Sequence, residues 1–147
     1  MIHINITKTF NCTVTELFSM IDSIDRLAQV KKSLSRFTVA RSEPGLQIAD
    51  AVIPNLVLNM NARLKYSTRP DNYAELKQIS GDFREYLCTY AIREAGVDTV
   101  LDMELRVKFR LGPIGFLRSL PLKPLYRLRI HSELRRLERQ VRRMKTA

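Results

Sequence analysis

The sequence lacks several residue types on which common protein chemistries depend. It has no tryptophan, two cysteines (Cys12 and Cys88) and two histidines (His3 and His131). Without a Cys-x-x-Cys spacing or clustered histidines, these residues predict neither a disulfide framework nor a metal site, and no motif indicates a cofactor. Free cysteines are typical of a reducing compartment such as the cytoplasm.

Long apolar runs are also missing. No window of 18 or more consecutive apolar residues occurs, and residues 1–11 alternate apolar and polar side chains where a signal peptide would have a continuous apolar segment. We therefore expect a soluble, cytoplasmic protein that contacts a membrane only peripherally. The length of 147 residues predicts a single domain, 1–147, as a monomer or weak dimer.

The most prominent feature is the C-terminal stretch 121–145, in which apolar residues recur every three or four positions. This spacing predicts a long helix with one apolar stripe, formed by Leu122, Tyr126, Ile130, Leu134, Leu137, Val141 and Met144. The formal net charge is +10, and residues 118–147 hold 10 lysines and arginines against only Glu133 and Glu138. We expect the apolar stripe to be buried while the arginines face water or an anionic surface.

The upstream part predicts a strand at 2–10, a helix at about 13–21 and a second short helix at 24–30. Thr13 and Glu16 have the spacing of a capping box. Alternating segments at 35–42, 46–53, 56–66, 73–80, 83–93 and 97–111, separated by short turns, predict an antiparallel meander. The predicted fold class is α+β: a curved antiparallel sheet of about seven strands that grips the C-terminal helix, with two short helices after the first strand.

A twisted sheet curves, so a straight helix across its concave face leaves room between them. We expect a cavity there for a hydrophobic small molecule. The residues expected to bind this ligand are Met60, Leu64, Tyr86, Cys88, Tyr90, Met103, Leu105, Val107, Ile130, Leu134 and Leu137. Placing Tyr86, Cys88 and Tyr90 inside is favoured because Met103 and Leu105 would pack against them, although Leu87, Thr89 and Ala91 are nearly as apolar.

Several of these features together resemble a known superfamily. They are the opening strand followed by a capped helix, the connection Ile79-Ser80-Gly81-Asp82-Phe83, the strand 97–111, and the apolar loop 112–121 before the closing helix. In these features nearly the whole chain resembles the START-related, polyketide cyclase/dehydrase and coenzyme Q-binding superfamily, which has the helix-grip fold. The resemblance implies a domain that binds lipids, quinones or polyketides, with catalysis in only some branches. The chain departs from many relatives in having no tryptophan after the first helix.

Few residues are candidates for catalysis. Asp50 alternates with Leu46, Ile48 and Val52, which predicts an apolar face on which a carboxyl group would have a raised pKa, although a strand end can also reach water. The hydroxyl of Tyr90 could polarise a ligand carbonyl. His3 and His131 are expected on the surface.

Three functions remain open from the sequence. The first is binding of a hydrophobic molecule, with possible contact between an anionic membrane and Arg118, Lys123, Arg135, Arg139 and Arg142. The exposed position of Leu128 on that face is compatible with such contact. Loop 112–121 would either cover one end of the sheet or act as a lid or a shallow membrane contact beside Arg118 and Lys123. The second is a cyclase or dehydratase acting in the same cavity. Nucleic-acid binding ranks last, because Tyr126 is the only aromatic residue among the arginines.

Overall fold

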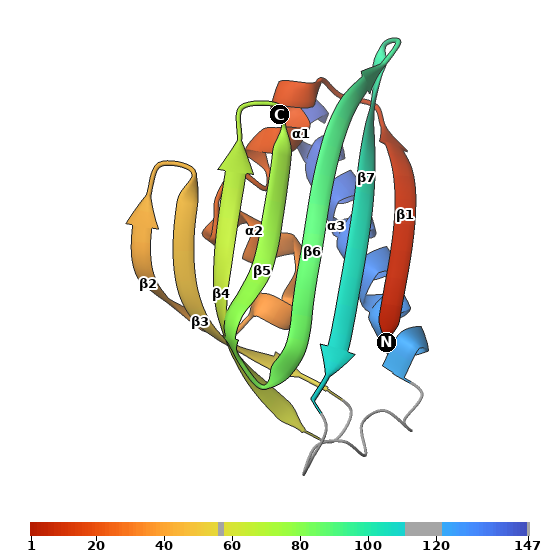
Figure 1. The fold of residues 1–147 in the computed structure, drawn as a ribbon. Helices are drawn as coiled ribbons and strands as arrows, with labels where there is room; N and C mark the ends of the chain where they lie inside the picture. Colours follow the sequence, from red (N-terminus) through yellow and green to blue (C-terminus); the bar gives the residue numbers. More distant parts are fainter. Residues whose placement is uncertain (56–57, 111–121, 147) are drawn as a thin grey trace.

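The computed structural model describes residues 1–55, 58–110 and 122–146. Its elements, in chain order, are β1 (Ile2–Phe10), α1 (Val14–Ser19), α2 (Ile24–Val30), the 3₁₀ helix η1 (Lys32–Leu34), β2 (Phe37–Glu43), β3 (Leu46–Pro54), β4 (Asn59–Arg69), β5 (Tyr73–Gly81), β6 (Phe83–Ala95), β7 (Asp98–Phe109) and α3 (Leu122–Thr146). Figure 1 shows one sheet with the long helix α3 running across it. The predicted α+β class is confirmed.

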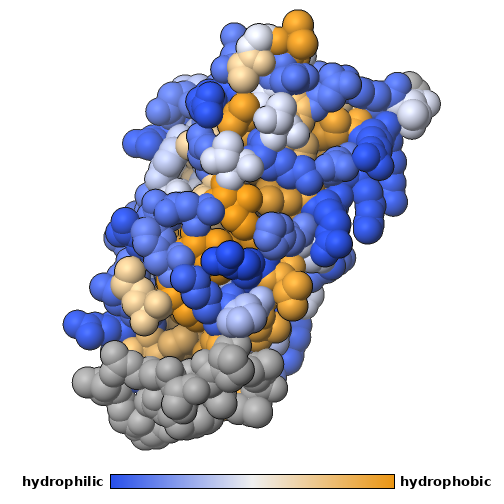
Figure 2. Space-filling view, turned by 90° about the vertical axis from the view of Figure 1, so that its right-hand side faces the viewer, coloured by the Kyte–Doolittle hydropathy of each residue, from blue (hydrophilic) through white to orange (hydrophobic). Residues whose placement is uncertain are grey.

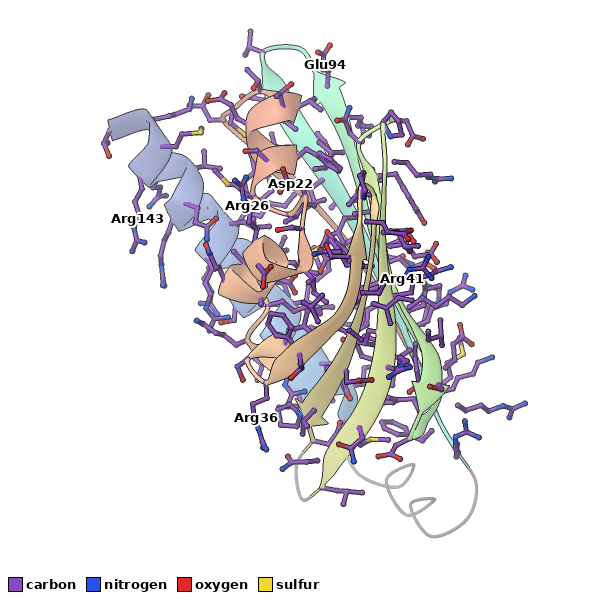
Figure 3. The ribbon with its side chains drawn as sticks, turned by 90° about the vertical axis from the view of Figure 1, so that its left-hand side faces the viewer. Asp22, Arg26, Arg36, Arg41, Glu94 and Arg143 are labelled. Atoms are coloured by element: carbon purple, nitrogen blue, oxygen red, sulfur yellow. The ribbon has the colours of Figure 1, made fainter. Side chains whose placement is uncertain are left out.

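The seven strands form a single antiparallel sheet in the order β1-β7-β6-β5-β4-β3-β2. Strands β2 to β7 form a meander, and β1 pairs with β7. The segment α1-α2-η1 therefore carries the chain from one edge of the sheet to the other. Viewed from the β2 edge, all helices lie on the same face of the sheet (Figure 3). This face is the concave side that the sequence predicts to be covered.

The curved sheet contains register shifts between neighbouring strands and one close approach of two strands at a glycine. The register shifts between Arg63 and Leu64 on β4 and between Phe83 and Glu85 on β6, as expected of β-bulges. Gly81 has a φ of +144°, and a Cβ atom there would lie 2.6 Å from the carbonyl oxygen of Asn61. Only glycine fits where β5 passes so close to β4.

The two short helices begin at polar caps. The Thr13 hydroxyl accepts a hydrogen bond from the Glu16 amide at 3.1 Å, and the Glu16 carboxylate accepts one from the Thr13 amide at 2.9 Å. The predicted capping box is thus confirmed. The side chain of Gln47 on β3 accepts a bond from the Ile24 amide at 2.7 Å, which fixes the start of α2 against the sheet.

The apolar stripe of α3 faces the sheet as predicted. Its buried apolar residues are Leu122, Tyr126, Ile130, Leu134, Leu137 and Val141, while Met144 is half-buried. They belong to one core with the inward residues of the sheet, among them Leu64, Tyr66 and Tyr90. The core is therefore continuous from the sheet through α2 to α3.

Strand β3 faces the other way from the prediction. Ala49, Ala51 and Ile53 are buried, and Asp50 is exposed on the outer face. The expectation that Asp50 lies on the apolar face is wrong because both parities of this strand contain apolar residues. Strand β4 is described from Asn59. The predicted start of this strand at residues 56–57 lies outside the described residues, and so does the predicted loop 112–121.

Candidate functional site

The residues predicted to bind a ligand come together in the core. All of them are buried: Met60, Leu64, Tyr86, Cys88, Tyr90, Met103, Leu105, Val107, Ile130, Leu134 and Leu137. Leu64, Tyr90 and Leu137 have an exposed fraction of 0%. Because a cavity wall becomes accessible once a water molecule fits beside it, neighbouring side chains fill the space around these three residues. Ligand binding at this set stays a prediction, and it requires the core to open.

A buried polar network lies in the middle of this core. The Lys31 ammonium is 3.3 Å from Oε2 of Glu133, and the two residues are 5% and 2% exposed. The Tyr90 hydroxyl donates a hydrogen bond of 2.6 Å to Oε1 of the same carboxylate. The Sγ atom of Cys88 lies 3.9 Å from the Lys31 ammonium. One carboxylate from α3 thus joins a lysine after α2 to a tyrosine on β6.

Local structure places both charged residues inward. The amide of Lys31 donates to the Leu27 carbonyl at 2.8 Å and caps the C-terminus of α2, so its side chain continues the inward face of that helix. Glu133 follows Ile130 by three residues and falls on the apolar stripe of α3. Neither residue was predicted from the sequence, although their helical spacing to Leu27 and Ile130 was a usable signal.

Burial and charge fix the protonation of this network. Burial opposes the ammonium form of Lys31, but the negative charge of the adjacent Glu133 carboxylate outweighs this and holds the pKa of Lys31 well above its usual value. Burial also raises the pKa of the Tyr90 hydroxyl and of the Cys88 thiol. At neutral pH all three groups therefore keep their protons, and Tyr90 is available as a hydrogen-bond donor.

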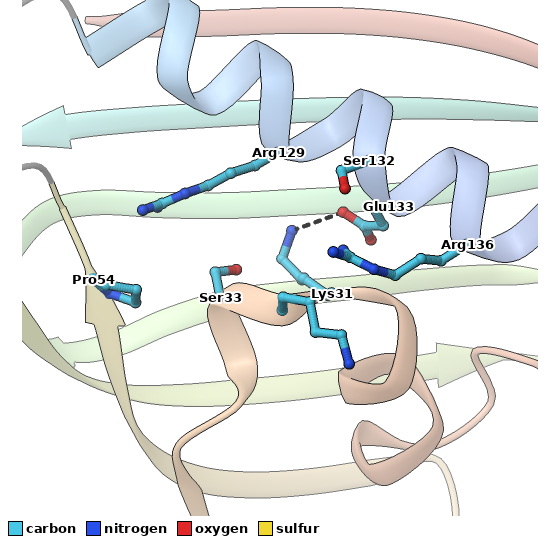
Figure 4. Close-up of a pocket in the computed structure, with 8 residues that line it drawn as sticks. Lys31, Ser33, Pro54, Arg129, Ser132, Glu133 and Arg136 are labelled. Atoms are coloured by element: carbon cyan, nitrogen blue, oxygen red, sulfur yellow. Dashed lines mark hydrogen bonds and ion pairs between the residues drawn. The ribbon is translucent and has the colours of Figure 1, made fainter.

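The network reaches the surface at a hollow of about 200 Å³ between η1, the end of β3 and α3. It is lined by Lys31, Lys32, Ser33, Pro54, Arg129, Ser132, Glu133 and Arg136. Figure 4 shows Ser33 facing the gap across from the α3 side chains, with the Arg129 side chain extending toward Pro54. A path of polar groups thus leads from solvent to the buried Lys31–Glu133 pair.

Arg129 and Arg136 depart from the predicted solvated face, because both are half-buried. The guanidinium of Arg129 lies 5.3 Å from the centre of the Tyr126 ring, and the Tyr126 hydroxyl donates to Oδ1 of Asn55 at 2.5 Å. Among the described residues, Nη1 of Arg129 and Nδ2 of Asn55 are buried without a hydrogen-bond partner. Arg136 donates from Nη1 to the Val30 carbonyl at 3.2 Å.

The weaker candidates lie away from this site. Arg63 donates to Asp50 from Nε at 2.8 Å and from Nη2 at 3.0 Å, and this hydrogen bonding lowers the pKa of the exposed Asp50 carboxyl. A lowered pKa is the opposite of what the sequence suggested for a general acid. His3 and His131 are exposed, as predicted.

The predicted anion-binding surface is solvent-exposed where it is described. Lys123, Arg135, Arg139 and Arg142 are exposed, and Arg118 lies outside the described residues. Arg142 is partly neutralised, because it lies 2.8 Å from Glu138. Beside these residues, a groove of about 620 Å³ between β1 and α3 includes Ile6 and Leu128, the latter 64% exposed. Figure 2 shows apolar patches among hydrophilic residues on this side of the molecule.

No protein-family model matches the chain, and no curated protein matches it in sequence. Solved structures do match. TTHA0849 from Thermus thermophilus superposes with a TM-score of 0.79 at 15% identity, over 95% of this chain and 96% of that one. A START superfamily protein from Mycobacterium smegmatis gives 0.72 at 15% identity, over 97% and 98% of the two chains.

A third match is the Zhui aromatase/cyclase from Streptomyces sp. R1128, with a TM-score of 0.74 at 10% identity over 96% of this chain and 93% of that one. The chain therefore has the fold shared by START superfamily and polyketide aromatase/cyclase proteins, as its sequence predicts. In the described parts of the chain, no helix is both long and apolar enough to cross a membrane.

Proposed function

We propose that this domain binds a small amphipathic molecule of the lipid, quinone or polyketide-like class between the sheet and α3. The observation that carries the proposal is the Lys31–Glu133–Tyr90 network, buried in an apolar core and reached from a surface hollow. Burying an ion pair costs more desolvation energy than its attraction usually returns, so well-packed apolar residues would stabilise the fold equally well. A polar centre at the end of an apolar interior suits a ligand with one polar end.

Binding requires side chains in the core to move. Met60 and Met103 are buried at inward positions of β4 and β7, and methionine side chains repack more readily than branched ones. The apolar part of a ligand would replace the contacts that these side chains give up. A ligand carbonyl or hydroxyl would take the hydrogen bond that Tyr90 now donates to Glu133.

The experiment is native mass spectrometry of the protein purified from its own host, with extraction and identification of any retained molecule. We expect a hydrophobic molecule to remain on the wild-type protein and on Lys77→Met, an exposed substitution on β5. Lys31→Met should retain less of it. The proposal would be refuted if the wild-type protein retained no hydrophobic molecule and also failed to bind an added alkyl probe such as decanol.

A cyclase or dehydratase is the second candidate, and the Tyr90–Glu133 hydrogen bond favours it. The Tyr90 hydroxyl, held protonated by burial, is placed to protonate or polarise a carbonyl, and Glu133 could receive a proton. The fold match to an aromatase/cyclase is compatible with this reading. Loss of turnover in Tyr90→Phe with unchanged ligand affinity would identify an enzyme, whereas unchanged turnover would exclude Tyr90 as the catalytic acid.

The exposed basic side chains of α3 support contact with an anionic membrane from which the ligand is taken. Leu128 projects from the same helix and supplies an apolar contact.

Nucleic-acid binding fits less well, because Tyr126 is 2% exposed and cannot stack on a base.

A further inference from the structure

We infer that the hollow between η1, the end of β3 and α3 is an oxyanion site that takes the carboxylate or phosphate head of an acidic amphiphile. The inference rests on the proposed function for the apolar part of the ligand. It adds the chemical class of the polar end and the residues that bind it.

The charge of the lining is the first argument. Of the described charged residues that line the hollow, Glu133 is the only acid, and it is already paired with Lys31 at 3.3 Å. Lys32, Arg129 and Arg136 remain, and none of them forms an ion pair with another described residue. The hollow therefore carries an excess of positive charge in a partly buried setting, where attraction to an anion is screened less than at the surface.

The position of Arg129 is the second argument. Its Nη1 atom is buried and without a hydrogen-bond partner among the described residues, which costs free energy in the unliganded protein. The guanidinium is held over the Tyr126 ring, and Tyr126 is in turn fixed by its bond to Asn55. A preorganised guanidinium binds a carboxylate or phosphate with two parallel hydrogen bonds and loses little entropy in doing so.

The remaining lining completes an oxyanion site. Ser33 and Ser132 bring hydroxyl donors from opposite sides of the hollow, from η1 and α3 (Figure 4). Arg136 is anchored by its bond to the Val30 carbonyl, which leaves other N–H groups of its guanidinium for a ligand. Each residue type is a common donor to oxyanions.

The volume of the hollow indicates that it holds the head group of a ligand and not the whole molecule. A hollow of about 200 Å³ is smaller than the roughly 300 to 1,000 Å³ typical of complete small-molecule sites. It accommodates a carboxylate or phosphate group with a few waters, and the buried end of the hollow leads to Lys31 and the core. The alkyl part would therefore lie in the core and the acid group at Arg129.

Isothermal titration calorimetry with decanoate, decyl phosphate, decanol and inorganic phosphate tests this assignment. We expect both acidic amphiphiles to bind the wild-type protein roughly tenfold to a hundredfold more tightly than decanol, because a charge-assisted hydrogen bond contributes that much. Arg129→Met and Arg136→Met should each remove most of that preference, measured as the ratio of decanoate to decanol affinity. Arg139→Met, an exposed substitution on the same helix, should behave as wild type.

The outcomes separate the two proposals. Equal affinity for decanol and decanoate would overturn the oxyanion site and leave the proposed function standing. If inorganic phosphate alone binds in an Arg129-dependent way, the oxyanion site is supported while amphiphile binding fails. Binding of inorganic phosphate as tightly as decyl phosphate would overturn the acidic amphiphile as ligand. If Arg129→Met does not fold, as judged by circular dichroism, Arg136→Met decides the question.

Discussion

At Glu133, a single carboxylate satisfies two buried donors, one on Lys31 and one on Tyr90. Glu133→Gln would leave the Lys31 ammonium buried without a counter-charge. We expect this substitution to lower the free energy of unfolding by about 3 to 5 kcal/mol, as measured by urea denaturation. The double variant Lys31→Met/Glu133→Leu should lose less, because it removes both charges and deprives only the Tyr90 hydroxyl of its acceptor.

The matched control is the half-exposed surface pair of Lys8 and Glu138, whose charged atoms are 2.7 Å apart. Glu138→Gln should change stability by less than about 1 kcal/mol, because solvent screens the pair. A Glu133→Gln variant as stable as Glu138→Gln would show that the buried network contributes nothing to folding.

The buried hydroxyl and thiol groups predict instability in alkaline solution. Burial raises the pKa of Tyr66, Tyr86, Tyr90 and Cys88 in the folded protein. In the unfolded chain these groups titrate near pH 8.5 to 10, so the unfolded state releases protons first. Stability is therefore fully present below about pH 8.5, and it falls as pH rises above this value toward the raised pKa values of the folded protein.

Each group that ionises only in the unfolded chain should cost about 1.4 kcal/mol per pH unit. Urea denaturation at about pH 8 and about pH 10.5 measures the fall, and Tyr90→Phe should make it shallower. Equal stability at both pH values would contradict the burial of these groups.

How far the sequence predicts the site depends on the residue. Tyr86, Cys88 and Tyr90 lie inward as predicted, and the basis of that prediction was the expected packing of Met103 and Leu105 against them rather than a clear alternation of their strand. Lys31 and Glu133 were missed because charged residues are normally exposed, and only the tertiary contact between α2 and α3 gives each its partner. Helical spacing indicates that each of these side chains points inward, but local periodicity does not show which partner it meets.

Among the elements, strand pairing depends on one backbone position that the sequence marks only as a turn. Gly81→Ala would place a Cβ atom 2.6 Å from the Asn61 carbonyl oxygen. We expect a loss of about 2 kcal/mol or more in the free energy of unfolding, because positive φ strain and a backbone clash combine.

Gly96 is the matched control, because it has a φ of +66° but no atom within 4 Å of the position that a Cβ would take. Gly96→Ala should cost about 1 kcal/mol from strain alone. Similar losses in the two variants, measured by thermal or urea denaturation, would show that the close approach of β5 to β4 is unimportant.

The elements themselves were largely predictable, because helix caps and alternating strands are local signals. Strand β3 was the exception. Its interior face carries Ala49 and Ala51, and small side chains let η1 pack closely against the strand. Ile48 and Val52 are half-buried on the outer face, so both faces of the strand carry apolar residues and alternation alone does not identify the inner one.

For the whole molecule, the uneven charge predicts that the exposed basic residues of α3 bind an anionic membrane. Arg135→Gln/Arg139→Gln/Arg142→Gln should lose co-sedimentation with phosphatidylserine vesicles, since each basic residue near an anionic surface contributes about 1 kcal/mol. Binding of the wild-type protein should weaken at high salt because the charges are screened.

The control variant Arg36→Gln/Lys77→Gln/Arg84→Gln removes the same charge from exposed positions on other elements. It should still co-sediment with the vesicles. If both triple variants lose binding equally, net charge rather than the basic face of α3 explains the attraction.

The pairing of β1 with β7 has a consequence for synthesis in the cell. Ile2 lies opposite Val107, so the first strand leaves the ribosome long before its hydrogen-bonding neighbour is translated. During that interval the nascent chain exposes an unsatisfied strand edge bearing Ile2, Ile4 and Ile6, which is a hazard for aggregation. The apolar residues of β1 therefore remain without their sheet partner until β7 has been synthesised.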